Sequence, residues 1–86
     1  MNYFSERFRL EVIVTDHALA RARERDIVDA ELKDVIETGT AKYRDSNRLW
    51  IYKAVTGRTD NLICAAVVLD GRLVVKTVMI NWELLE

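Results

Sequence analysis

The 86-residue sequence contains no proline, one cysteine, one histidine and three glycines. The single cysteine, Cys64, excludes an internal disulfide framework, and one cysteine with one histidine cannot form a structural zinc set. Cys64 itself stands in an apolar stretch that predicts a core position rather than a reactive thiol. Three separated glycines are too few for a glycine-rich phosphate loop. We therefore expect neither a metal site nor a cofactor.

Long apolar runs are also missing. The longest, Leu62 to Leu69, has eight residues, which suits a buried strand and falls well short of the roughly 18 residues of a membrane span. The first residues lack the basic-then-apolar order of a signal peptide. These features predict one domain over residues 1–86, without membrane contact, in the cytoplasm of a bacterial-type cell.

Charge of one sign does not dominate, because the formal net charge is −1. The distribution is uneven: residues 1–25 sum to +1, residues 26–37 to −4 and residues 38–86 to +2. Proteins that bind nucleic acid non-specifically are usually plainly basic, so the total argues against a broad electrostatic grip on RNA or DNA. A local basic site beside an acidic helix remains compatible with it.

The first half of the chain predicts one strand and two short helices. Apolar residues alternate from Phe8 to Val14 as in a half-buried strand,. Thr15 and Asp16 can cap a helix that runs to about residue 25. A second helix is predicted over residues 29–38, with its acidic residues on a solvated face and Gly39 in the position of a C′ glycine,.

The second half predicts strands separated by turns. We expect strands at 41–44, 48–55, 61–69 and 72–80, with turns at 45–47 and at Asp70-Gly71 and a loop at 56–60,. Residues 1–6 show no clear pattern, and residues 81–86 form a tail. The predicted class is α+β: an N-terminal strand, two short helices, and then a three- to four-stranded antiparallel sheet.

The last two predicted strands are apolar on both faces, which is unusual for an antiparallel sheet with one face in water,. Something must cover the second face. The candidates are the surroundings of the N-terminal strand, the tail with Trp82, or another protein chain. A homodimer or a bound partner is therefore one interpretation of the pattern.

Three residues of the first predicted helix form a row. His17, Arg21 and Arg25 are spaced i, i+4 and i+8, so they drift only about 40° per step around one face. Histidine titrates near neutrality and can move protons, while arginine binds phosphate oxygens in a bidentate manner. The same spacing also suits a merely soluble helix face, with Arg21 paired to Asp16 or Glu24.

A hydroxyl and several aromatic residues complete the candidates. Thr77 lies in the last predicted strand among apolar residues, where it either positions a ligand or is simply a strand-favouring residue,. Trp50, Tyr52 and Tyr43 could stack on nucleic-acid bases. Core packing or a protein interface would explain them equally well.

The pattern Thr15-x-His17-Ala18-x-x-Arg21-x-x-x-Arg25-x-Ile27, followed by an acidic helix and a strand meander with Val75-Lys76-Thr77-Val78, resembles a small bacterial domain of unknown function. That domain is grouped with the RelE and BrnT toxins of the barnase–colicin–RelE-like nuclease fold. The resemblance spans roughly residues 10–80, and Asp26 stands where the family usually has glycine. It implies the same strand, helix and sheet order.

The resemblance further implies that His17, Arg21 and Arg25 face the end of the sheet near Thr77 and form an active cleft. The expected function is a metal-independent ribonuclease of a toxin–antitoxin system, with RNA and a cognate antitoxin as partners. The alternative from the residues is a non-enzymatic interaction module, or a homo-oligomer, that uses the apolar sheet face.

Overall fold

The computed structural model describes residues 2–54 and 63–80, without the side chains of Ile63, Cys64 and Ala66. The predicted loop at 56–60, the tail with Trp82 and the core position of the Cys64 side chain therefore lie outside the described residues. Within them, no helix is long and apolar enough to cross a membrane.

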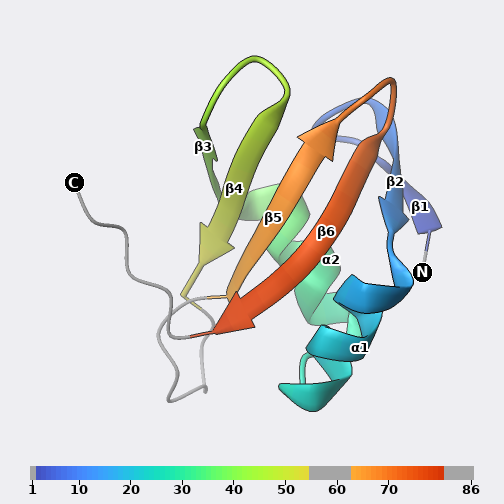
Figure 1. Ribbon diagram of the computed structural model, residues 1–86, viewed down its shortest axis with the longest axis vertical. Helices are drawn as coiled ribbons and strands as arrows, with labels where there is room; N and C mark the ends of the chain where they lie inside the picture. The colour runs from blue at the N-terminus through green and yellow to red at the C-terminus, as the bar shows by residue number, and fades with distance from the viewer. Residues whose placement is uncertain (1, 55–62, 81–86) are drawn as a thin grey trace.

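Two helices and six strands make up the described fold (Figure 1). In chain order they are β1 Asn2–Ser5, β2 Leu10–Val14, α1 Asp16–Glu24, α2 Asp29–Thr38, β3 Thr40–Tyr43, β4 Arg48–Lys53, β5 Ile63–Leu69 and β6 Leu73–Ile80. All six strands form one sheet in the order β1-β2-β6-β5-β4-β3. The predicted α+β class is confirmed.

The sheet differs from the prediction in size and in type. It has six strands rather than three or four, because the N-terminal strands join it and residues 2–5 form an unpredicted strand. It is mixed rather than antiparallel, because β2 pairs with β6 in parallel, with Val12 opposite Leu73 and Val14 opposite Val75. This pairing joins segments about sixty residues apart, so no local pattern reports it.

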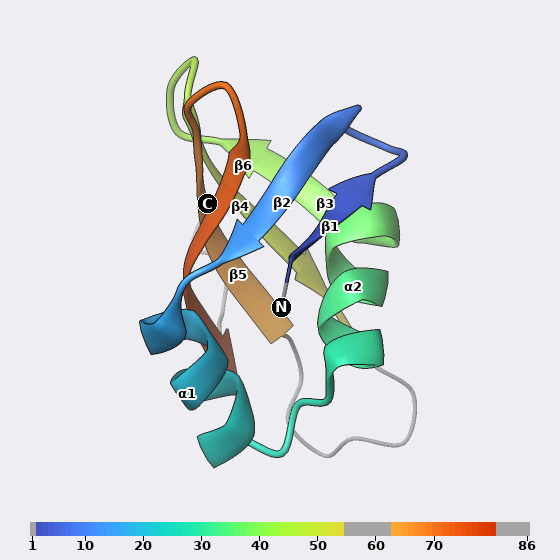
Figure 2. The same cartoon turned by 90° about the vertical axis from the view of Figure 1, so that its right-hand side faces the viewer.

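The core lies between one face of the sheet and the two helices. Its side chains come from both helices and from the four central strands, with Val12, Val35, Ile51 and Val75 all fully buried. Helix α2 lies behind β4 and β5 in Figure 1, whereas α1 lies beside the C-terminal half of β6, where β2 has already ended (Figures 1 and 2). No described helix covers the other side of the sheet, which we call the open face.

The unpredicted strand β1 is held to the end of α2 by Glu37. Its carboxylate accepts hydrogen bonds from Ser5 Oγ at 2.6 Å, Tyr3 Oη at 3.1 Å and the backbone N–H of Glu6 at 2.9 Å. Arg7 donates to the carbonyls of Ile36 and Gly39 at the C-terminus of the same helix. The predicted solvated acidic face is therefore wrong at Glu37, which fastens the N-terminal hairpin to the helix.

Gly39 ends α2, but not in the left-handed conformation that a C′ glycine usually adopts. Its φ is −73° and its ψ is 171°, which any residue can adopt. Glycine is needed for space instead: a Cβ there would meet the carbonyl oxygen of Val35 and lie 2.8 Å from that of Tyr52. The helix and β4 can approach each other only because this position lacks a side chain.

Candidate active site on helix α1 and the open face

Helix α1 begins where it is joined to β6. Thr15 is its N-cap: the side-chain Oγ1 accepts a hydrogen bond from the N–H of Ala18 at 3.1 Å, which satisfies one of the unpaired donors of the first turn. The same hydroxyl donates to the carbonyl of Val75 at 3.1 Å, and the Thr15 N–H reaches that carbonyl at 3.2 Å. The start of α1 is thus fastened to the middle of β6.

His17 and Arg21 lie along the accessible side of α1. His17 is exposed in the first turn, two residues after the threonine that contacts β6. Arg21 is 44% exposed and forms an ion pair with Glu24 at 2.9 Å. An exposed pair of this kind contributes at most about 1 kcal/mol, so it can exchange for a phosphate with little loss.

Arg25 occupies a different position from the other two residues of the predicted row. It is the C-cap of α1 and is only partly accessible, and its Nε atom is buried. In helical projection it lies roughly 20° from Ala18, and Ala18 and Ala22 form the buried row that faces the core. The stem of Arg25 therefore follows the core side of the helix, while His17 and Arg21 follow its accessible side.

A β-bulge determines which way Thr77 faces. On β5, Ala66 pairs with Thr77 but Val67 pairs with Val75, so Lys76 is the extra residue of β6. A bulge of this type changes the alternation of the strand, so Val75 and Val78 are both buried although they are three residues apart. Plain alternation would put Thr77 on the side of Val75. The bulge instead directs Thr77 to the open face beside Lys76.

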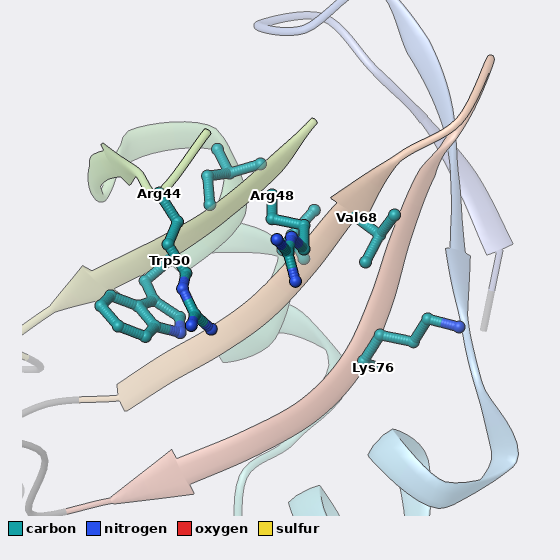
Figure 3. Close-up of a pocket in the computed structure, with 7 residues that line it drawn as sticks. Arg44, Arg48, Trp50, Val68 and Lys76 are labelled. Carbon is teal, nitrogen blue, oxygen red and sulfur yellow. The ribbon is translucent and has the colours of Figure 1, made fainter. Parts of the chain in front are cut away.

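The open face also carries basic and aromatic residues of β4. Trp50 and Tyr52 alternate with the buried Ile51 and are half-buried on the open face. Arg44 lies over the Trp50 ring, 5.9 Å from its centroid, and Figure 3 shows the two side chains together. Of the alternatives for Trp50 and Tyr52, core packing is therefore wrong. Tyr43, at the sheet edge, is 54% exposed.

Arg48 stands next to this pair and is held by an acidic partner. Its guanidinium contacts the Asp45 carboxylate at 2.7 Å. The hydrogen bond from Arg48 lowers the pKa of Asp45, helped by the backbone N–H of Asn47, which favours the charged form of this carboxylate,. Sequence reasoning missed Arg44 and Arg48. The signal that could have found them is the basic residues just before and after the turn at 45–47, next to an outward-facing tryptophan.

The structure therefore brings two groups of candidate residues to neighbouring elements. His17 and Arg21 lie on α1, whereas Thr77 and Lys76 lie on the part of β6 beside which α1 packs. Among the described residues, no hydrogen bond or ion pair joins His17 or Arg21 to Thr77. The part of the chain that the structure describes also holds no group of three or more histidine, cysteine or acidic residues able to bind a metal ion.

The fold and this arrangement define a small α+β domain with a mixed sheet, one face of which carries no helix among the described residues. The chain belongs to the family described as Domain of unknown function (DUF4258), which matches residues 14–80. The match covers α1 with its histidine and every later described element. No curated protein and no solved structure matches the chain.

Proposed function

We propose that the protein is a toxin-like ribonuclease that cleaves RNA without a metal ion. The observation that carries the proposal is the joint between Thr15 and Val75, because it ties the helix with the exposed His17 to the bulged segment of β6. The resemblance of the sequence pattern to the RelE and BrnT toxins supports it.

The chemistry needs one proton carrier and fixed positive charge. The RNA 2′-oxygen attacks the adjacent phosphorus and loses its proton while the bond from phosphorus to the 5′-oxygen breaks and that oxygen gains a proton. The products are a 2′,3′-cyclic phosphate and a free 5′-hydroxyl. His17 carries one of these two protons and water carries the other. Arg21 stabilises the extra negative charge of the transition state, and Thr77 positions the phosphate.

Arg25 also belongs to the proposed site, but it has a smaller role in binding phosphate than Arg21. Because its stem follows the core side of α1 and its Nε is buried, only the outer guanidinium nitrogens are placed to meet a phosphate. We therefore assign the larger electrostatic effect to Arg21.

The test is cleavage of a mixed RNA by the wild type and by His17→Ala, in buffer containing EDTA. General acid–base catalysis contributes about 10²- to 10⁴-fold, so His17→Ala should lose activity by that factor while chelation changes nothing. Arg21→Ala should also lose activity. Arg23→Ala is the matched control, because it removes the same charge from an exposed position elsewhere on α1. Equal cleavage by wild type and His17→Ala, or no cleavage by the wild type, would exclude the proposal.

A second candidate is a non-enzymatic interaction module whose open face docks an antitoxin-like partner or a second copy. The observation in its favour is the half-buried apolar group Ile13, Val68 and Val74, which neighbouring strands place side by side on that face. Light scattering in solution tests the homo-oligomer: a dimer that Val74→Lys converts to a monomer would support it, and a strict monomer would count against it.

A further inference from the structure

Side chains from β3, β4, β5 and β6 stand next to one another at the centre of the open face. Arg48, Val68 and Val74 stand opposite one another across β4, β5 and β6. Lys42 of β3 stands opposite Trp50, which puts its side chain on the same side of the sheet. The result is an apolar floor beside the half-buried indole of Trp50, with cations on β3 and β4 next to it.

The cations are spread across the face rather than gathered at one point. In Figure 3, Arg44 lies beside Trp50, and Lys76 reaches toward β2 on the opposite side of the face. One carboxylate, that of Asp45, binds Arg48. Within residues 2–54 and 63–80, no ion pair neutralises Arg44 or Lys76. Fixed positive charge distributed over several strands suits a polyanion better than a single small ion.

The hollow between these residues is small. Arg44, Arg48, Trp50, Val68 and Lys76 contribute to its lining, and its volume is about 100 Å³. Sites that enclose drug-sized molecules measure roughly 300–1,000 Å³. The face is therefore suited to an extended ligand that lies across it and contacts it at separate points.

We infer that the open face binds single-stranded RNA, with one base stacked on Trp50 and with phosphates bound by Arg44, Arg48 and Lys76. Stacking on an aromatic ring needs a base that is not already stacked in a duplex, which favours a single strand. The choice of RNA rests on the proposed function, because the strand would pass from Trp50 over Lys76 toward Thr77 and α1. An acidic protein segment is the competing occupant, since its carboxylates could pair with the cations but it brings no base to stack on Trp50.

The experiment measures the anisotropy of a labelled single-stranded RNA of roughly 12 nucleotides, with His17→Ala as the parent protein so that binding is separated from cleavage. Trp50→Ala should weaken binding roughly 5- to 150-fold, and Trp50→Phe should retain most of it. Arg44→Ala and Lys76→Ala should each reduce the slope of log affinity against log salt by about 0.7. Lys33→Ala is the control for charge, because Lys33 lies on α2 over the Tyr3 ring.

Circular dichroism establishes that each variant is folded before its affinity is compared. Unchanged affinity and salt slope in Trp50→Ala and Lys76→Ala would overturn the inference. Displacement of the RNA by poly-glutamate of equal length and at equal concentration would also overturn it, in favour of an acidic protein partner.

The two proposals fail in different ways. Binding that depends on Trp50, together with a wild type that does not cleave RNA, would refute the proposed ribonuclease activity and support RNA binding by the open face. Cleavage of dilute RNA that is lost in His17→Ala but unchanged in Trp50→Ala and Arg44→Ala would refute RNA binding by the open face and support the proposed ribonuclease activity.

Discussion

Glu37 carries a negative charge at the C-terminal end of α2, where the helix dipole disfavours it. A carboxylate in the last turn of a helix opposes the helix dipole, and nothing near it in the sequence compensates. The structure supplies the compensation from the N-terminal hairpin, whose Ser5 and Tyr3 hydroxyls and turn N–H groups donate to the carboxylate. Burial raises the pKa of Glu37, but these hydrogen bonds outweigh that effect and lower it,.

Glu37→Gln should therefore destabilise the protein and flatten its acid sensitivity. Because the folded pKa of Glu37 lies below its unfolded value, the carboxylate contributes its full stability above the ordinary value of 4.5 and loses that contribution as the pH falls through the folded pKa,. We expect a loss of about 1–3 kcal/mol in the free energy of unfolding at pH 7. Urea unfolding between pH 7 and pH 3 measures both effects. Glu24→Gln on α1 is the control, and an equally steep acid loss in wild type and Glu37→Gln would contradict the assignment.

The glycines that end α2 and turn the β5–β6 hairpin serve different purposes, and alanine separates them. At Gly39 a Cβ would press on two backbone carbonyls, whereas at Gly71, whose φ is +65°, nothing lies within 4 Å. Gly39→Ala should cost about 3 kcal/mol because backbone on both sides must move. Gly71→Ala should cost about 1 kcal/mol, the strain of a left-handed alanine. Thermal unfolding of the pair checks this order, and a larger loss at Gly71 would reverse the interpretation.

At the scale of elements, the sequence predicted what depends on nearby residues. The bounds of α2 are the predicted 29–38, because an apolar stripe and Gly39 define them locally. The β5–β6 hairpin forms as expected at Asp70-Gly71, although Leu69 pairs with Leu73 and the loop therefore holds three residues rather than two. Strand β1 was missed because four residues offer too little alternation to recognise.

The candidate site also has features that the local sequence predicts and features that depend on strand pairing. His17 and Arg21 could be placed on one side of α1 from their spacing alone. The direction of Thr77 could not, because it depends on a register shift between β5 and β6. The grouping of Arg44 and Trp50 with Lys76 depends on the order of the strands in the sheet, which no local pattern contains.

The bulge in β6 predicts an unusual tolerance to deletion. Lys76 is the residue without an opposite partner on β5, so removing it restores plain alternation and keeps Val75 and Val78 on the buried side. Deleting Val74 instead turns Val75 outward, because each residue removed from a regular strand reverses the side chains beyond it. Chemical denaturation should show a stable Lys76 deletion and an unfolded or strongly weakened Val74 deletion. Equal damage from the two deletions would mean that the bulge is required for folding.

At the scale of the molecule, charge is separated rather than balanced. Asp29, Glu31 and Asp34 lie on α2, behind the sheet, whereas Arg44, Arg48 and Lys76 lie on the open face. The net charge of −1 averages over these two sides. Total charge therefore understates the local attraction for an anion, which acts mainly within a Debye length of about 8–10 Å.

The sheet order also predicts which parts of the molecule open last. β5 and β6 are flanked by strands on both sides, whereas β1 and β3 lie at the edges. Native-state hydrogen exchange should find the slowest amides in β5 and β6, including those of the buried Val75 and Val78, and faster exchange in β1 and β3. Uniform protection across all six strands would contradict this ranking.

The parallel pairing of β2 with β6, together with the Thr15 hydrogen bonds to Val75, has a consequence for biosynthesis. A ribosome makes β2 and α1 early, but β6 leaves the exit tunnel after every other described element. Until then β2 lacks its inner neighbour and the histidine-bearing helix has no strand to fasten to. The growing chain therefore carries the candidate site unassembled until β6 emerges, and the two halves of that candidate site meet only when β6 is inserted between β2 and β5.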